Sequence, residues 1–123
     1  MIKFVMCVRR NPALSREEFS AYWRDHHGPL FRQYAHVYRA VRYVQSHTLD
    51  TPLNANQQAL RGTQPAFDGV GEIWWESEAD FLAAVQSPEV QKLRQMFVED
   101  EARFVDLANS SVFFTEEHVV IEG

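Results

Sequence analysis

The sequence of 123 residues contains one cysteine, Cys7, and no apolar run near the roughly 20 residues that span a bilayer. A single cysteine excludes an intrachain disulfide framework and a cysteine-based zinc site, and it is typical of a reducing compartment. The apolar start, residues 1–8, is too short for a secretory signal with its flanks. We therefore expect a cytoplasmic protein without a membrane partner.

Positive charge is also scarce. The 12 lysines and arginines stand against 17 aspartates and glutamates, which gives a formal net charge of -5. Because binding to a phosphate backbone needs clustered basic residues, nucleic acid is not expected as a partner. Aromatic residues, in contrast, are plentiful, with 9 Phe, 4 Tyr and 3 Trp. We expect one domain, residues 1–123, with a bulky interior that would suit a planar apolar ligand.

Four segments have the β-branched and aromatic composition of strands, and helices with clear start signals lie between them. The strands are expected at residues 2–9, 40–49, 70–75 and 111–115. Ser15 forms a capping box with Glu18, while Ser77 and Ser87 mark two later helix starts. Residues 50–65 are polar and rich in turn formers, which predicts a long surface loop.

The predicted order is β-α-β followed by β-α-β, in two halves of similar length. This order is typical of a ferredoxin-like α+β fold, a four-stranded antiparallel sheet with helices on one face. The strands carry apolar residues on both sides, and the chain has no spare helix to cover the second face. A second copy of the chain could cover this face, so we predict a homodimer packed sheet to sheet.

The segment 22–30 concentrates titratable side chains, with two aromatics, a carboxylate and two adjacent histidines ahead of Gly28 and Pro29. Pro29 cannot donate a helical hydrogen bond and disfavours helical geometry at Gly28, which predicts a bend or break directly after the histidines. The helix is expected to resume to about residue 38. Before the break, helical spacing predicts one apolar face that consists of Phe19, Tyr22, Trp23, His26 and Leu30.

His27 is the first candidate for chemistry, because an imidazole in a dry pocket can move protons near neutral pH. His26 lies nearer the centre of the predicted apolar stripe, although the break leaves that phase open, and it ranks second. On the second strand, Tyr43 and His47 share one face, where they could hold a carbonyl or phenol oxygen. Each of these four side chains also has a plainer interpretation as a packed, hydrogen-bonded residue.

The large aromatics Trp23, Trp75 and Phe104 are expected first as core residues and second as walls for a planar ligand. A metal site is not expected, because His26 and His27 are adjacent and diverge on a helix, and no His-x3-His or His-Glu-x-x-His spacing occurs. No haem-binding motif is present either. We therefore expect no metal and no other cofactor.

Several blocks of the sequence together resemble the EthD branch of the dimeric α/β-barrel proteins. The blocks are residues 2–3 with Arg9 and Arg10, 14–19, 22–30, 67–70, 72–74, 104–106 and 116–119. The resemblance covers nearly the whole chain except residues 50–65. It implies a ferredoxin-like fold that pairs into a dimeric α/β barrel, with a pocket between the sheet and the helices.

The same resemblance implies which residues line that pocket. His27 matches the histidine that points into it. Tyr43 matches a tyrosine that lines the site of lactone-isomerase relatives, and Ile73 stands where those relatives have a cysteine. Ile73 is therefore expected in the binding site, while the missing thiol argues against thiol-assisted chemistry.

These features favour a cofactor-independent enzyme that transfers protons on an apolar carbonyl, lactone or polyphenolic substrate, by isomerisation, dehydration or cyclisation. His27 would be the acid or base, and Tyr43 would orient the substrate oxygen. Two alternatives stay open. One is an oxidoreductase, a cofactor-free oxygenase of aromatics in which His27 deprotonates the substrate, and the other is a non-catalytic accessory or binding protein of a degradation pathway.

Overall fold

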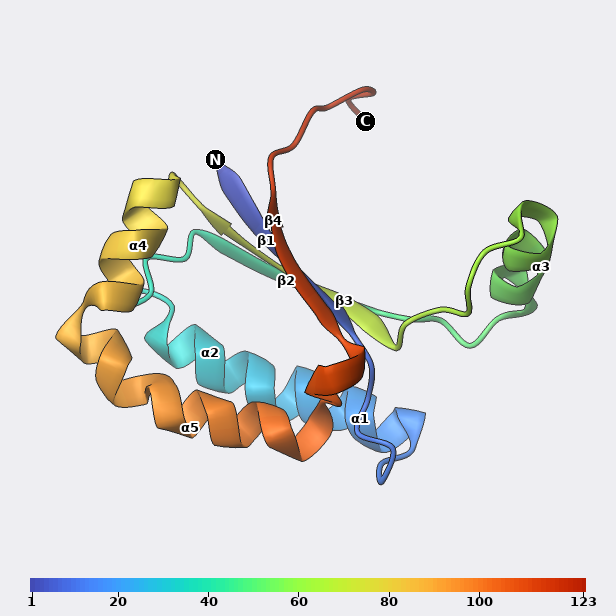
Figure 1. Cartoon of the computed structure of the whole chain (residues 1–123), viewed down its shortest axis with the longest axis horizontal. Coiled ribbons are helices and arrows are strands. Elements are labelled where there is room, and N and C mark those ends of the chain that lie inside the picture. Colours follow the sequence, from blue (N-terminus) through green and yellow to red (C-terminus); the bar gives the residue numbers. More distant parts are fainter.

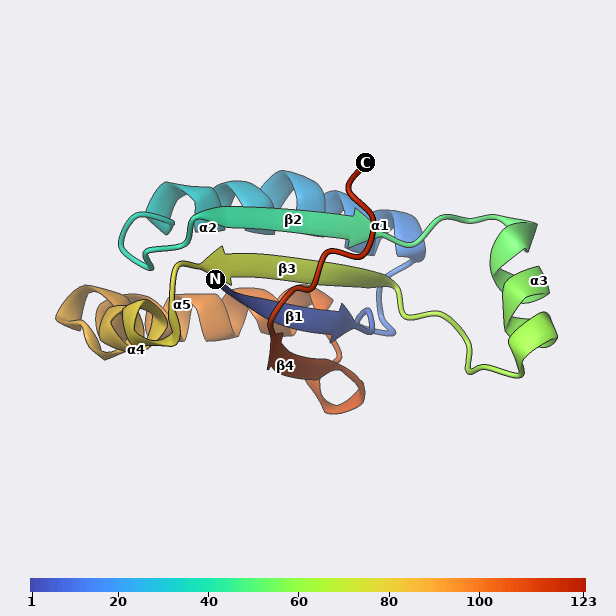
Figure 2. The same ribbon diagram turned by 90° about the horizontal axis from the view of Figure 1, so that it is seen from above.

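The computed structural model describes all 123 residues. Its centre is a four-stranded sheet with the order β2-β3-β1-β4, in which every neighbouring pair is antiparallel. Figures 1 and 2 show the two central strands, β1 and β3, flanked by β2 on one edge and β4 on the other. The strands are β1 (Ile2–Val8), β2 (Arg42–His47), β3 (Gly69–Trp75) and β4 (Ser111–Thr115).

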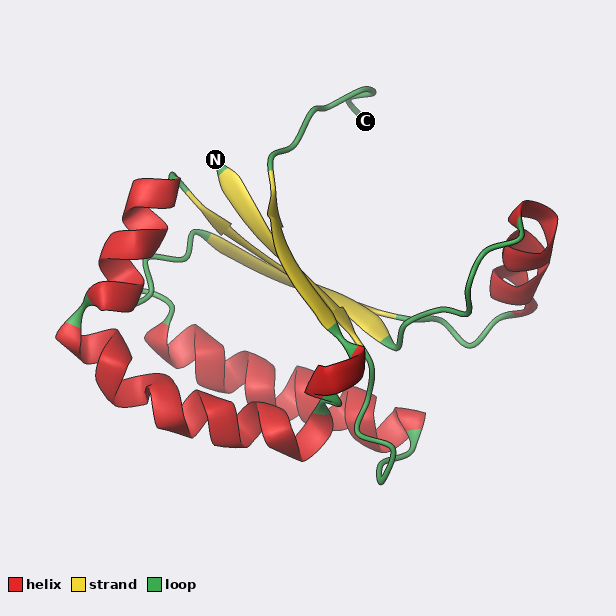
Figure 3. Cartoon of the chain, in the orientation of Figure 1, coloured by secondary structure: helices red, strands yellow, loops and turns green.

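Helices cover one face of this sheet (Figures 1 and 3), and a short 3-10 helix, η2 (Leu107–Asn109), precedes β4. The ferredoxin-like α+β arrangement expected from the sequence is confirmed. None of the helices combines the length and the apolar character needed to cross a membrane. The covering helices are α1 (Arg16–Tyr22), η1 (Trp23–His27), α2 (Gly28–Tyr34), α4 (Glu78–Gln86) and α5 (Pro88–Phe104).

Side-chain caps fix where these helices start. Ser15 accepts a hydrogen bond from the backbone of Glu18, whose carboxylate accepts one from the Ser15 backbone, so the predicted capping box is present. Ser77 caps α4 and Ser87 caps α5 in the same manner. Three of the start signals in the sequence therefore correspond to real helix starts.

Of the bend or break predicted after the histidines, the break does not occur. The helix runs on from α1 through η1 into α2 because η1 is a π-helical turn, in which the N–H of Gly28 donates to the carbonyl of Trp23, five residues back. The wider turn accommodates Pro29 within a continuous helix, which ends at Tyr34 rather than near residue 38.

The π turn also changes which side chains face the sheet. In the structure Phe19, Trp23 and Phe31 are buried, and His27 lies between them at the same spacing of four residues. An α-helix drifts by about 40° over four residues, and the extra residue of a π turn offsets that drift. His26, which the sequence placed on the apolar stripe, is exposed instead.

The core lies between the sheet and the helices. Its most buried cluster consists of Val8, Phe19, Trp23, Phe104 and Val105, with Met6, Leu14 and Tyr22 packed against it. Gly69 lets Trp23 lie directly on β3, because a Cβ atom at this position would come within 2.4 Å of the indole ring. The core therefore joins β1 and β3 to α1, η1 and α5.

The predicted loop at residues 50–65 is also wrong in part, because it contains helix α3 (Pro52–Arg61). Thr51 caps this helix, Pro52 occupies its first turn, and Gly62 ends it in the left-handed conformation with φ of 67°. No residue of α3 is buried, and Figure 2 shows the helix projecting beyond the end of the sheet. The sequence carried the caps but not the apolar stripe that usually reveals a helix.

The face of the sheet opposite the helices is not covered by any helix (Figure 1). Lys3 pairs with Glu72 across β1 and β3 at 2.6 Å, so this carboxylate lies outside the core. The indole of Trp74 on the same face donates to Glu117 of the C-terminal tail at 2.5 Å and is flanked by Arg42. Apolar side chains, including Phe113 at 46% exposure, complete this surface.

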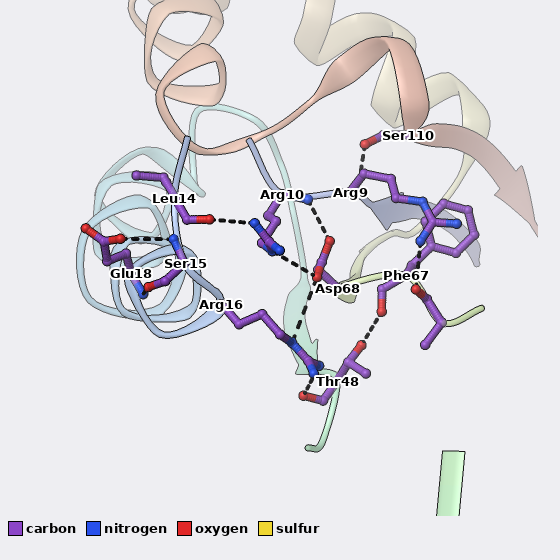
Figure 4. A network of polar contacts seen from close by, with 11 residues as sticks. Arg9, Arg10, Leu14, Ser15, Arg16, Glu18, Thr48, Phe67, Asp68 and Ser110 are labelled. Carbon is purple, nitrogen blue, oxygen red and sulfur yellow. Dashed lines mark hydrogen bonds and ion pairs between the residues drawn. The ribbon is translucent and has the colours of Figure 1, made fainter. Parts of the chain in front are cut away.

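Asp68, directly before β3, connects the ends of three strands (Figure 4). Its carboxylate accepts a hydrogen bond of 2.8 Å from the backbone N–H of Arg10 and lies 3.6 Å from the Arg10 Nε. Its backbone N–H donates to Val8, and its carbonyl accepts from Thr48. The Nε of Arg16 in α1 approaches the same carboxylate to 4.0 Å. The network fixes the start of α1 to this end of the sheet.

Candidate active site

A cavity of about 50 Å³ lies between the sheet and the helices. Most of its lining is apolar, and the titratable groups are the three side chains of His27, Tyr43 and Glu101. A mostly apolar lining with a few convergent polar groups is typical of small-molecule sites, whose volumes are usually about 300–1,000 Å³, so this cavity resembles them in its lining and is smaller. The complete lining is Phe4, Met6, Val8, Trp23, His27, Tyr43, Gly71, Ile73, Glu101, Phe104 and Val105.

His27 comes to the cavity from η1 and is held there by α5. Its Nδ1 lies 2.6 Å from Oδ2 of Asp100, a carboxylate that is only 1% exposed. Because a carboxylate only accepts hydrogen bonds, Nδ1 carries the proton and Nε2 is the ring nitrogen left for the cavity. Burial lowers the pKa of His27 below its ordinary value, although Asp100 acts in the opposite direction. Burial therefore favours the neutral imidazole, which has a free lone pair on Nε2.

Asp100 is itself fixed by a second donor. The hydroxyl of Tyr22 donates to its Oδ1 at 2.5 Å, and the Arg103 guanidinium lies 3.6 Å from the same oxygen. Three groups from two helices therefore surround one buried carboxylate. This arrangement holds the His27 ring in one orientation, as the carboxylate partner of a general base does.

Glu101, the next residue of α5, also lines the cavity. Its carboxyl makes no hydrogen bond or ion pair with any other residue. Burial, with a smaller effect from Asp100, raises the pKa of this carboxyl above its ordinary value. A carboxyl with a raised pKa can carry a proton closer to neutral pH, so Glu101 is suited to give or take one.

Tyr43 stands on β2 and connects the cavity to the surface. It lines the internal cavity and also a groove of about 380 Å³ between α2 and β2. Its ring packs edge-on against Phe31, and its hydroxyl receives a hydrogen bond of 3.1 Å from the amide of Gln45. Burial raises the pKa of Tyr43, so the phenol keeps its proton at neutral pH and can donate it in a hydrogen bond.

Five of the residues predicted from the sequence meet at this cavity, although nothing in the structure shows what they do there. They are His27, Tyr43, Trp23, Ile73 and Phe104. The first two supply polar groups, and the others form its walls.

The other three predicted residues lie elsewhere. His26 is exposed and stacks on Tyr22, with 4.8 Å between ring centres. His47 does not reach the cavity, because its ring packs on Trp23 and its two nitrogens contact Ser20 and Gln45. Trp75 faces α4, where it packs on Phe81 and Phe114 and donates to the Tyr38 carbonyl.

Sequence reasoning missed Asp100 and Glu101. The signal was present, because both follow Phe97 and precede Phe104 at spacings of three and four residues, which places them on the apolar face of α5. Acidic residues on such a face are buried unless the helix ends first. No group of three or more His, Cys, Asp or Glu side chains is placed to hold a metal ion.

The fold and the cavity together define a class: a ferredoxin-like α+β domain that encloses a small, mostly apolar cavity with three titratable side chains between sheet and helices. The family model described as EthD domain matches residues 11–108. The chain therefore belongs to the EthD family, as its resemblance indicated. No curated protein matches the sequence.

Solved structures with the same fold include an EthD family protein from Bacillus halodurans, 14% identical with a TM-score of 0.63, where the match covers 96% of this chain and 99% of that one. A dimeric protein with a ferredoxin-like fold from Bacteroides fragilis is 8% identical with a TM-score of 0.58, covering 94% and 95%. A Deinococcus radiodurans protein described as a candidate antibiotic biosynthesis monooxygenase is 14% identical with a TM-score of 0.54, covering 100% of both chains.

Proposed function

We propose that the protein is a small-molecule enzyme that transfers protons on an apolar carbonyl, lactone or polyphenolic substrate, as an isomerase, dehydratase or cyclase does. The observation that carries this proposal is the contact of 2.6 Å between His27 and the buried Asp100 beside the cavity. It leaves one basic ring nitrogen at a mostly apolar cavity that Tyr43 also lines. Acid–base chemistry by such side chains needs no cofactor.

In this mechanism, Nε2 of His27 takes a proton from a carbon next to the substrate carbonyl. The electrons of that C–H bond move toward the oxygen, and the Tyr43 hydroxyl stabilises the charge that develops there by a hydrogen bond. Protonated His27 or the carboxyl of Glu101 then returns a proton to another atom of the substrate. Asp100 stabilises the imidazolium that forms between the two steps.

One alternative has a specific observation in its favour. The Deinococcus radiodurans protein of the same fold is described as a candidate monooxygenase, and a base beside an apolar cavity would also deprotonate a phenol for reaction with oxygen. In that case His27 keeps its role, but the reaction consumes O2. A non-catalytic binding protein would use the same cavity without turnover.

We also propose that two copies pair through the uncovered sheet face. Support comes from the apolar residues on this face, such as Phe113, from the absence of a helix over it, and from the Bacteroides fragilis protein of the same fold, which is described as dimeric. Light scattering should give the mass of a dimer for the natural protein and of a monomer for Phe113→Glu. Leu60→Glu, on the projecting helix α3, should stay dimeric. A monomeric natural protein at micromolar concentration would contradict the pairing.

The experiment that tests the enzymatic proposal uses a set of lactones, 1,3-dicarbonyl compounds and polyphenols in D2O. NMR detects both product formation and exchange of C–H for C–D. His27→Gln should lose about 10²- to 10⁴-fold in rate, which is the usual contribution of a general base. His26→Gln is the matched control, because that neighbouring imidazole is exposed.

An oxygen electrode separates the oxygenase alternative, since only an oxygenase consumes O2. Saturable binding without exchange, product or O2 uptake would favour the binding protein. Equal rates for His27→Gln and the natural protein would remove His27 from the mechanism.

A further inference from the structure

Four polar side chains form a continuous row from α1 to β2, beginning at Ser20 and ending at Tyr43. The hydroxyl of Ser20 contacts Nδ1 of His47. Nε2 of His47 lies 2.8 Å from Oε1 of Gln45. The amide nitrogen of Gln45 lies 2.8 Å from the carbonyl oxygen of Trp23 and 3.1 Å from the hydroxyl of Tyr43. The row therefore ends at the cavity.

The carbonyl of Trp23 determines the direction of every hydrogen bond in this row. A carbonyl oxygen only accepts, so the group of Gln45 that faces it must be the NH2 and not the oxygen. Oε1 of Gln45 then faces His47, and it must accept a hydrogen bond from Nε2–H. In the neutral ring, which burial favours by lowering the pKa of His47, the other nitrogen carries no proton and accepts from Ser20. His47 is thereby assigned one neutral tautomer.

The same reasoning fixes the hydroxyl of Tyr43. An amide NH2 only donates, so the Tyr43 oxygen accepts from Gln45, and its own proton is not used in that bond. Tyr43 lines the cavity. We propose that Gln45 is a positioning residue that turns the Tyr43 proton toward the cavity, so that the ligand atom bound there is an acceptor such as a carbonyl or phenolate oxygen.

This inference rests on the proposed function and adds two residues to it. Gln45 positions Tyr43, and His47 positions Gln45, so His47 acts at a distance from the cavity in place of the catalytic role expected from the sequence.

The backbone directly after the π turn leaves room for Gln45. Gly28 follows η1 without a side chain, and a Cβ atom there would lie only 3.0 Å from the Gln45 nitrogen. Gln45 can therefore reach the Trp23 carbonyl.

Gln45→Glu is the decisive variant, because it keeps the shape of the side chain and reverses its hydrogen bonding. A carboxylate accepts from both His47 and Tyr43, which draws the Tyr43 proton away from the cavity. The probe is acetophenone, a neutral aromatic carbonyl compound, titrated against the natural protein by tryptophan fluorescence. We expect its dissociation constant to rise about tenfold in Gln45→Glu and about tenfold in Tyr43→Phe. Gln33→Glu, at an exposed position of α2, should bind like the natural protein.

The double variant Gln45→Glu with Tyr43→Phe separates positioning from mere structural damage. If Gln45 acts through the Tyr43 proton, the double variant also loses about tenfold, whereas independent effects would multiply to about a hundredfold. A hundredfold loss, normal binding by Gln45→Glu, or no saturable binding to the natural protein would overturn the inference.

A second readout needs no ligand. The 15N NMR spectrum of the natural protein should show His47 with its proton on Nε2 and a bare Nδ1, and the opposite tautomer would overturn the assignment. These results are distinct from a failure of the proposed function. Normal activity of His27→Gln would remove His27 from the proposed mechanism, while the binding and NMR results for Gln45 would stand.

Discussion

Replacement of Asp100 by Asn tests how far the buried carboxylate supports both the fold and the site. The carboxylate is 1% exposed and accepts hydrogen bonds from His27 at 2.6 Å and Tyr22 at 2.5 Å. A hydrogen bond to a charged group contributes about 1.5–3 kcal/mol, against about 1 kcal/mol for a neutral one. Two bonds that become neutral therefore cost about 1–4 kcal/mol, and we take about 2.5 kcal/mol as the expected loss in the free energy of unfolding.

Urea unfolding measures this loss. With a slope of about 2 kcal/mol per molar urea, typical of a domain of this size, 2.5 kcal/mol lowers the midpoint by about 1.2 M. The matched control is Glu99→Gln, the neighbouring exposed acid on α5, which should change stability by less than about 0.5 kcal/mol. All variants are compared at one protein concentration, because a dimer makes the midpoint depend on it.

The same variant also changes His27. An Asn side chain can offer its NH2 to Nδ1, which leaves the proton of the imidazole on Nε2 and removes the base from the cavity. We expect a loss of about 10²- to 10⁴-fold in the rate of any reaction that His27 catalyses. If Asp100→Asn unfolds at the same urea concentration as Glu99→Gln and retains full activity, the role assigned to the carboxylate is wrong.

Three further predictions follow from single contacts. Gly69→Ala should lower the free energy of unfolding by about 1–3 kcal/mol, because its Cβ would lie 2.4 Å from the Trp23 ring. Gly71→Ala, whose Cβ would lie 3.4 Å from the same ring, should lower it much less. Equal urea midpoints for the two variants would contradict this prediction. The raised pKa of Glu101 stabilises the natural protein below the unfolded pKa of this carboxyl, and that stability is lost above the folded pKa. Glu101→Gln should therefore become more stable relative to the natural protein as pH rises from 4 to 7. Parallel curves of stability against pH would contradict this prediction. The pKa of His27 is lowered, so activity should fall with acid along a limb centred below pH 6.5, and a limb centred above it would exclude His27 as the base.

Local signals in the sequence predicted much of the fold. The capping box of Ser15 and Glu18 placed α1, and Ser87 placed α5, because a cap depends only on residues within one turn. The alternation of strand residues placed Tyr43 and His47 together on one face of β2, as the register of β2 with β3 confirms.

The errors came from effects that extend beyond one turn. Pro29 predicts a break by its own chemistry, but the π turn ahead of it preserves the helix and moves His27 and Phe31 into the core positions expected for His26 and Leu30. A register change of this kind depends on which packing the finished core favours, and no local pattern encodes it. Helix α3 escaped prediction because it buries no side chain of its own.

Five of the cavity-lining residues were named from the sequence, whereas Asp100 and Glu101 were missed. The family resemblance favoured His27 over His26, and the structure places the buried carboxylate of Asp100 against its ring. That partner is 73 residues away in sequence, so only the packing of η1 against α5 brings the two together. His47 shows the reverse case, because its strand face was predicted and its partners, Ser20 and Gln45, were not.

The central claim is that His27 presents an unprotonated Nε2 to the cavity while its Nδ1–H is bound to Asp100. The most direct measurement is the 15N NMR spectrum of the two ring nitrogens at pH 7, assigned by comparison with His27→Gln. The claim predicts a neutral imidazole with its proton on Nδ1 and a bare Nε2, and this state should shift to the other tautomer in Asp100→Asn. A doubly protonated ring, or a proton on Nε2 in the natural protein, would contradict the claim.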